Sequence, residues 1–269
     1  MAEEILDYSF HETEVRKAIA NEAIKGINLE GLPIEVSYAD IDQVANDDYI
    51  IIRRDGFGAS DSSILLGVNP FKNIQELIKE KASTTISAEE RAIGELVNVR
   101  KGRDLEPLII EKFEKHFKQE TFKPKDMYRF KEYPYLTVNF DGVTAVDEQY
   151  IPAEIKVVTM FGEKYYNPHK AMFNESEGFK ELPEDVSMRN WSIENKAAFY
   201  GIPPYYYTQL QQQIMALNAP YGHLSVLFDK SWRFYTYHIW RDNTVLKDLI
   251  VIGYKTWEKV EALRSVKNG

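Results

Sequence analysis

The sequence predicts an α/β fold, because segments with the alternating pattern of strands are interspersed with segments that have helical periodicity. Residues 133–158 have the pattern of two strands joined by a short acidic loop, and residues 223–240 have that of a second hairpin. Residues 104–118 and 203–217 instead carry apolar side chains at helical spacing. With 269 residues, 44% of them hydrophobic, the chain can bury a substantial core in one elaborated domain.

Charge divides the chain near residue 47. Residues 1–47 contain eleven acidic and three basic side chains, whereas the remainder is close to neutral although the net charge is −9. We therefore expect an acidic N-terminal arm over residues 1–47, with a short amphipathic helix around residues 15–23, and one domain over residues 48–269. The domain can present a local basic surface to nucleic acid, although a solvated surface of mixed charge explains the same composition.

Several classes of site and location are excluded or disfavoured by composition. The chain has no cysteine, which excludes disulfides and cysteine-ligated metal centres. Its five histidines lack the spacing of a zinc site, and the loops lack a glycine-rich nucleotide-binding motif. The first residues do not resemble a signal peptide, and no apolar run reaches membrane-spanning length, so we expect a cytoplasmic protein without membrane contact.

A possible anion site follows the apolar residues 49–52. Two arginines, Arg53 and Arg54, precede a glycine-rich turn, and Ser60 then opens a helix. Free backbone N–H groups at a helix start beside an arginine can bind a phosphate. An ordinary capped helix after a turn explains the same residues. Another helix is expected over residues 71–81, after Gly67 and Pro70 end the first.

The helix expected over residues 104–118 has a carboxylate on its apolar side. At about 100° per residue, Glu106 projects between Phe113 and Phe117, within the stripe that faces the core. A buried carboxylate is costly unless it is paired or bound to a metal. Glu106 is therefore a candidate functional residue.

The hairpin over residues 133–158 carries the most distinctive polar residues. Alternation puts Asp141 on the polar face of the first strand, and Glu154 and Lys156 together on the polar face of the second. Two carboxylates offer oxygen ligands to Mg²⁺, and an ammonium beside them can orient a water or help to deprotonate it. The pattern is common, however, and a half-exposed hairpin with unrelated charges explains it equally well.

The remaining segments complete the α/β pattern. Residues 161–199 show little periodicity, which favours an irregular functional excursion over the surface. The helix over residues 204–217 has Tyr207, Leu210 and Ile214 in a core stripe, with glutamines on its flanks. Such glutamines are usually solvated, but they could contact phosphate or nucleobases. A helix from residue 242 packs after the closing hairpin.

Five blocks in order resemble one family. The blocks RRDGFGASDSSILLGVNPF, GRDLEPLIIEKF, YLTVNFDGV, AEIKVV and PPYYYTQLQQQI are similar to those of the YqaJ-like viral recombinase and phage lambda exonuclease family, within the PD-(D/E)xK nuclease superfamily. The resemblance covers roughly residues 49–260 and implies a restriction-endonuclease-like core, with a central mixed β-sheet flanked by helices. Residues 48–269 are then a PD-(D/E)xK exonuclease domain.

The resemblance also implies roles for individual residues. Asp141 and Glu154 match the metal-binding carboxylates, the carbonyl of Ile155 matches a further metal ligand, and Lys156 matches the catalytic lysine. Glu106 matches a helix carboxylate near the metal. Gln209 matches the catalytic glutamine of a Y-x-x-Q-x-Q helix, with Tyr206 and Gln211 beside it.

A second set of residues is implied to bind DNA. Arg53, or Arg54 as the alternative in register, matches the arginine that holds the terminal 5′-phosphate together with Ser60. The family often has Ser-Pro before the catalytic Asp-Gly, whereas this chain has Asn139 there, which can still donate hydrogen bonds to phosphate.

The implied activity is Mg²⁺-dependent 5′→3′ degradation of one strand of linear duplex DNA in phage-type homologous recombination, with Mn²⁺ as a substitute metal. A phage- or prophage-encoded protein in the bacterial cytoplasm, a homotrimer and a single-strand annealing partner are expected on the same ground. Two alternatives stay open: a structure- or sequence-specific DNA endonuclease of the same fold, and a DNA-binding module without catalysis.

Overall fold

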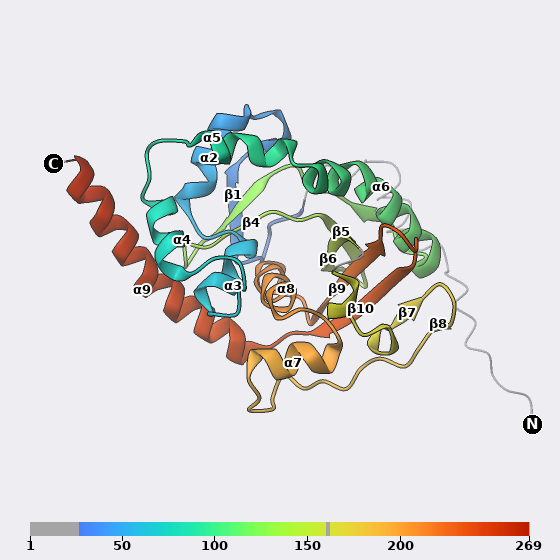
Figure 1. Cartoon of the computed structure of the whole chain (residues 1–269). Coiled ribbons are helices and arrows are strands. Elements are labelled where there is room, and N and C mark those ends of the chain that lie inside the picture. The colour runs from blue at the N-terminus through green and yellow to red at the C-terminus, as the bar shows by residue number, and fades with distance from the viewer. Residues whose placement is uncertain (1–26, 160–161, 269) are drawn as a thin grey trace, which may run out of the picture.

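The computed structural model describes residues 27–159 and 162–268, which form two β-sheets around a central helix (Figure 1). The strands are β1 (Ile34–Tyr38), β2 (Thr121–Phe122), β3 (Met127–Phe130), β4 (Thr137–Val138), β5 (Gly142–Val146), β6 (Gln149–Val158), β7 (Phe173–Asn174), β8 (Gly178–Phe179), β9 (Tyr221–Phe228) and β10 (Phe234–Trp240). The α-helices are α2 (Asn46–Ile52), α3 (Ser62–Leu65), α4 (Ile74–Lys81), α5 (Ala88–Ala92), α6 (Val97–Phe117), α7 (Ile193–Tyr200), α8 (Pro204–Ala216) and α9 (Asn243–Asn268).

The larger sheet of the described residues is mixed. Its seven strands follow the order β2-β5-β6-β9-β10-β7-β8. Strand β6 pairs antiparallel with β5 on one side and parallel with β9 on the other. A smaller antiparallel sheet has the order β1-β3-β4. The predicted α/β class, with a central mixed sheet flanked by helices, is confirmed.

Helices α6 and α8 cover opposite faces of the larger sheet (Figure 1). Ile109 and Phe113 of α6 pack in one cluster with Ile155 of β6. The neighbours of Ile155 in β6, Glu154 and Lys156, face α8 instead. Leu210 and Ile214 of α8 are part of the main hydrophobic core. Because each face of β6 meets a different helix, the alternation of this strand decides what its side chains contact.

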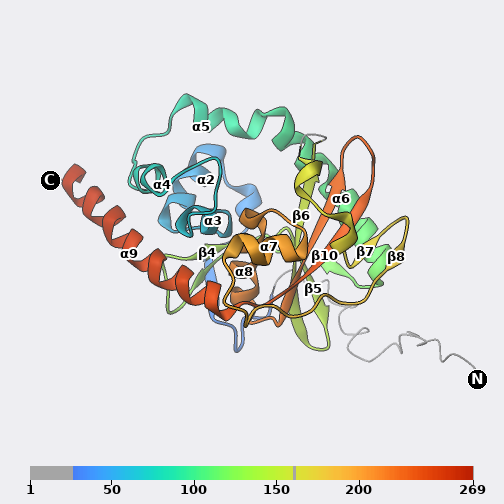
Figure 2. The ribbon, with the colours of Figure 1, turned by 60° about the horizontal axis from the view of Figure 1, so that its bottom comes forward.

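Helix α9 closes the molecule along the side formed by α3, α4 and α8, and its last turns extend past the body (Figure 2). Among the described residues, no helix combines the length and apolar character needed to cross a membrane. The helix expected at residues 15–23 lies outside the described residues. Within the expected arm, Ile34 to Tyr38 form β1 and pair with β3 of the body.

The first strand predicted for the central hairpin is divided in the structure. Residues 136–141 do not form one strand: β4 pairs with β3 in the small sheet, whereas β5 starts at Gly142 and pairs with β6. A Cβ atom at Gly142 would lie 2.8 Å from Cγ2 of Thr121, so β2 can approach this point because the residue is glycine. Asp141 consequently lies between two sheets, just before β5 begins.

The prediction that residues 161–199 are irregular is wrong in part. Short strands β7 and β8 extend the larger sheet beyond β10, and α7 occupies the end of the segment. Strands of two residues are too short to leave an alternating pattern in the sequence. Their pairing depends instead on the neighbouring strand β10.

Candidate active site

The carboxylates and the lysine predicted from the central hairpin lie together. Nζ of Lys156 is 3.1 Å from Oδ2 of Asp141 and also contacts Oε1 of Glu154. Glu154 and Lys156 point from β6 toward α8, as strand alternation predicts. The side chain of Glu154 is 0% exposed, whereas those of Lys156 and Asp141 are 22% and 31% exposed. The cluster therefore opens to solvent on the side of Asp141 and Lys156.

Two glutamines of α8 hold the buried carboxylate. Nε2 of Gln209 donates to Oε1 of Glu154, and Nε2 of Gln213 donates to Oε2 at 2.6 Å. Gln209 was expected here, whereas Gln213 was not identified from the sequence. The spacing of four residues between them was the available signal, because it places both on one helix face.

Two carboxylates and one ammonium leave this cluster with excess negative charge. Burial and then the charge of Asp141 raise the pKa of Glu154 to about 7. Although burial acts in the opposite direction, Lys156 and the backbone N–H of Ile155 hold the pKa of Asp141 below its ordinary value. The two carboxylates likewise outweigh burial and raise the pKa of Lys156. The two carboxylates thus favour the charged form of Lys156 in this arrangement.

The donor set fits part of a magnesium site. A fully buried carboxylate with an incompletely balanced charge is stabilised by an additional cation. The N–H of Ile155 donates to Oδ2 of Asp141 at 3.2 Å. In an extended strand the N–H and C=O of one residue point to the same side, so the carbonyl of Ile155 points toward Asp141. Two carboxylates and one carbonyl suit Mg²⁺, which usually keeps several waters.

Glu106 is not brought into the same cluster. Its Oε1 accepts a 2.6 Å hydrogen bond from Nζ of Lys123, the residue directly after β2. Burial lowers the pKa of Lys123, but Glu106 and the charge of Asp141 outweigh this effect and raise it. Among the described residues, no three His, Cys, Asp or Glu side chains are grouped closely enough to enclose a metal. Glu106 was expected on the core-facing side of its helix; its side chain is 18% exposed, and its partner is Lys123.

The two candidate phosphate-binding arginines have different surroundings. Nη2 of Arg53 donates to Oγ of Ser60 at 3.3 Å, and both residues are exposed. Arg54 is buried, and its guanidinium contacts Oε1 of Glu90 at 2.6 Å and the carbonyl of Ser83 at 3.0 Å. Of the two registers that the sequence allowed, Arg53 is the arginine that lies beside Ser60.

A buried ion pair fixes the turn that carries Arg53 and Ser60. Nζ of Lys81, at the end of α4, lies 2.7 Å from Oδ2 of Asp61 and donates to the carbonyl of Arg53 at 2.7 Å. Oδ2 of Asp61 also accepts from the N–H of Gly58 at 3.0 Å. The contacts with the carbonyl of Arg53 and the N–H of Gly58 join backbone to these buried charges, so they hold both ends of the turn in place.

The other glutamines of α8 are buried, contrary to the expectation that they flank the core in solvent. Nε2 of Gln212 donates to the carbonyls of Phe57 and Thr137 at 3.0 and 2.8 Å. Gln211 points away from the site and bridges the backbone of Trp240 and Asp242. Helix α8 lies inside the molecule, so its polar side chains satisfy buried backbone groups.

Asn139 lies at the inner end of the site. Its backbone carbonyl accepts a 3.3 Å hydrogen bond from Nε2 of Gln213, the residue that also holds Glu154. Asn139 is therefore tied to the same helix as the catalytic candidates. Its proposed contact with phosphate stays a prediction.

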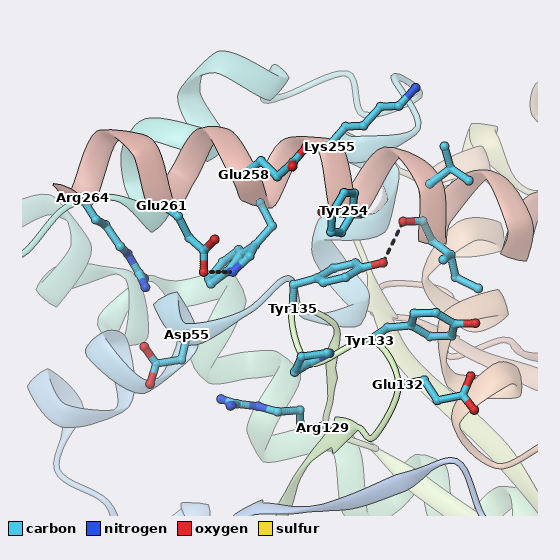
Figure 3. A pocket seen from close by; sticks show the side chains of 14 residues that line it. Asp55, Arg129, Glu132, Tyr133, Tyr135, Tyr254, Lys255, Glu258, Glu261 and Arg264 are labelled. Carbon is cyan, nitrogen blue, oxygen red and sulfur yellow. Dashed lines mark hydrogen bonds between the residues drawn. The ribbon is translucent and has the colours of Figure 1, made fainter. Parts of the chain in front are cut away.

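A groove of about 890 Å³ lies on another part of the molecule, between α9 and the loop from β3 to β4 (Figure 3). The hydroxyl of Tyr135 crosses it to the carbonyl of Ile250 at 2.9 Å, and the indole of Trp257 contacts Glu261. None of the predicted site residues lines this groove.

Comparisons with known proteins identify the family and the fold. The model of the YqaJ-like viral recombinase domain matches residues 48–218. The uncharacterized protein YqaJ of Bacillus subtilis (strain 168) is 29% identical over 99 residues, which are 37% of this chain and 30% of that relative. The match thus spans less than a third of the relative.

Two solved structures share the fold. The crystal structure of an alkaline exonuclease (LHK-Exo) from Laribacter hongkongensis has a TM-score of 0.50 and 12% identity, over 82% of this chain and 96% of that one. The same protein in complex with dAMP has a TM-score of 0.51 with the same identity and coverage. At this identity the likeness concerns the fold.

Proposed function

Because the chain belongs to the family of YqaJ-like viral recombinase domains, we propose that it is a phage-type exonuclease acting on linear duplex DNA. The observation that carries the proposal is the cluster of Asp141, the buried Glu154 and Lys156, which α8 holds through Gln209 and Gln213. The fold shared with an alkaline exonuclease supports it. The cluster has the chemical groups for metal-assisted phosphodiester hydrolysis.

Asp141, Glu154 and the carbonyl of Ile155 would hold Mg²⁺, or Mn²⁺ in its place. A bound metal would polarise the scissile phosphate and lower the pKa of a water. Lys156 remains protonated beside both carboxylates, so its role is to place the water and to offset negative charge on phosphate. Gln209 and Gln213 fix the rotamer of Glu154. Glu106 joins this set only after it exchanges Lys123 for another cation.

The proposed polarity is 5′→3′. Arg53 and Ser60 form an exposed donor pair suited to a terminal 5′-phosphate, with Asn139 as a further donor near the scissile group. A homotrimer around DNA and a single-strand annealing protein as partner are part of the same proposal. They rest on family resemblance.

The testing experiment compares linear duplexes labelled at either end, with and without a 5′-phosphate, and a covalently closed circle, all with Mg²⁺. We expect mononucleotide release from the 5′-end, a strong preference for the phosphorylated end, and no cleavage of the circle. Cleavage of the circle would establish the endonuclease alternative instead. DNA binding without hydrolysis in any metal would establish the non-catalytic one.

A further inference from the structure

A row of aromatic side chains leads from the surface to the candidate active site. The ring centroids of Phe71 and Tyr205 are 5.8 Å apart, and those of Tyr205 and Tyr206 are 4.6 Å apart. The ring of Tyr206 lies 5.6 Å from Nζ of Lys156. We call Phe71, Tyr205 and Tyr206 the aromatic row. Its inner end meets the catalytic candidates, and its outer end is at the surface.

The outer end of the row is exposed and held in place. Phe71 is 81% exposed, although a phenylalanine in a structural role is normally buried. Oδ1 of Asn69 accepts from the N–H groups of Phe71 and Lys72 at 2.8 and 3.0 Å, and Nδ2 of Asn69 donates to Ser63. The loop thus presents the ring to solvent in a fixed conformation, which suits binding more than packing.

Cationic groups lie beside this end of the row. Lys72 follows Phe71 in the chain, and burial together with the charges of Lys81 and Arg53 lowers its pKa despite the opposing charge of Asp61. Arg53 in turn contacts Ser60. Through Lys72, the outer end of the row is within electrostatic reach of Arg53, and its inner end contacts Lys156 beside the carboxylates. A terminal nucleotide offers a phosphate to the first group and a phosphodiester bond to the second.

We propose that Phe71 and Tyr205 form a stacking surface for the base of the terminal nucleotide, while Arg53 and Ser60 hold its 5′-phosphate. The inference rests on the proposed exonuclease function and adds a base-binding element to it. Stacking on aromatic rings tolerates every base and is worth roughly tenfold or more in affinity. Stacking would let the enzyme bind an unpaired terminal base whatever its identity.

The test measures equilibrium binding of full-length protein to 5′-phosphorylated duplexes in Ca²⁺, by fluorescence anisotropy. One duplex has a normal terminal nucleotide, and the other has an abasic tetrahydrofuran nucleotide there. We expect wild type to bind the abasic end about tenfold more weakly. Phe71→Ala and Tyr205→Ala should weaken binding to the normal end by a similar factor and to the abasic end hardly at all.

Two controls define the interpretation. Tyr205→Phe keeps the ring and should behave like wild type. Phe179→Ala removes another exposed phenylalanine, 55% exposed on the edge strand β8, and should leave both affinities unchanged. Equal affinity of wild type for the two ends, or an equal loss in Phe71→Ala for both, overturns the stacking surface.

Hydrolysis of the same duplexes in Mg²⁺ separates this inference from the proposed function. Hydrolysis without a difference between the normal and abasic ends sustains the exonuclease and overturns the stacking surface. A difference in binding without hydrolysis sustains the stacking surface and overturns the exonuclease. Absence of DNA binding overturns both.

Discussion

Two lysine–carboxylate clusters, each with one fully buried carboxylate, lie on different sides of α8. One contains Glu154, Lys156 and Asp141, and the other joins Nζ of Lys196 to Oδ2 of Asp242 at 2.6 Å. Each cluster is contacted by a glutamine of α8, and the two glutamines are two positions apart. Two residues correspond to a rotation of about 200° around the helix axis, which places their side chains on opposite faces. Gln209 bonds Glu154, whereas Gln211 accepts from the backbone N–H of Asp242. The same residue types thus recur in both.

The two clusters differ in how completely their negative charges are balanced by positive ones. Asp242 has one cation as its partner, accepts from the hydroxyl of Tyr207, and also accepts from the N–H groups of Thr244 and Val245 at the start of α9. It is a neutral, satisfied pair that caps a helix. The cluster around Glu154 has two carboxylates for one lysine and opens to solvent. Excess charge and access, more than burial of charge, distinguish a candidate site from a structural pair.

The largest expected effect is on catalysis. Glu154→Gln and Lys156→Ala should each slow hydrolysis of 5′-phosphorylated duplex about 10⁴-fold, near 5 kcal/mol in activation free energy. Stability should change by no more than about 1 kcal/mol in Glu154→Gln, since removing one of two carboxylates relieves the charge excess. Single-turnover rates and urea unfolding measure both quantities. Activity close to wild type in these variants would refute the site assignment.

The structural pair should show the reverse behaviour. Asp242→Ala leaves Lys196 buried without its counter-ion and removes the cap of α9, so we expect a loss of about 4 kcal/mol in unfolding free energy. The double variant with Lys196→Met should recover part of that loss. Urea unfolding midpoints test this order. Hydrolysis per folded molecule should stay at the wild-type rate, and a large rate loss in folded Asp242→Ala would contradict the comparison.

A pair of buried, uncharged histidines predicts how the stability of the protein depends on pH. His223 and His238 face each other across β9 and β10, and burial lowers their pKa values from 6.5 to about 3 and about 4. The unfolded chain binds more protons below pH 6.5, so stability falls as pH falls from 6.5 toward 4. Between pH 7 and pH 5 this loss should approach about 2 kcal/mol per imidazole.

Urea unfolding at pH 7 and pH 5 measures this loss. His238→Phe should make the loss about 2 kcal/mol smaller, because one of the two titrating imidazoles is gone. The comparison with the variant is needed because the raised pKa of Glu154 adds stability over the same pH range. An equal change in wild type and His238→Phe would show that the folded state does not hold His238 neutral.

The smallest expected effects come from the glutamines. Gln209→Ala should reduce the rate of hydrolysis about tenfold with little change in stability, because the donor is lost beside a partly open cluster. Gln211→Ala should cost about 1 to 3 kcal/mol of stability, because two buried backbone groups lose their partner, and leave the rate unchanged. A stability loss in Gln209→Ala together with a rate loss in Gln211→Ala would show that the two faces of α8 have been assigned in reverse.

Local pattern was sufficient to predict the family, the fold class and the shared face of Glu154 and Lys156. Strand alternation is fixed by the backbone, so it holds whatever packs on either face. The choice between Arg53 and Arg54 could not be made from sequence, because it depends on Glu90, which is distant in the chain. The surroundings of Glu106 depended likewise on Lys123, outside its own helix.

The burial of Gln211, Gln212 and Gln213 was not predictable from their residue type. Glutamines on a helix are usually solvated, and only a helix surrounded on all sides turns them inward. The position of Asp141 between two sheets also depends on tertiary contacts. Strand β4 pairs with β3 and β5 pairs with β6, so the two strands belong to different sheets. These features could not be predicted from sequence patterns, because they depend on contacts between segments that are distant in the chain.

The parallel pairing of β6 with β9 has a consequence for the order of assembly during synthesis. Asp141, Glu154 and Lys156 leave the ribosome within one hairpin, but residues 159–220 must follow before β9 can pair with β6. Such a connection delays the long-range contact. Until α8 docks, Glu154 lacks Gln209 and Gln213 and its carboxylate stays hydrated. The acidic residues are therefore synthesised early, but the candidate active site is complete only after the last third of the chain has folded.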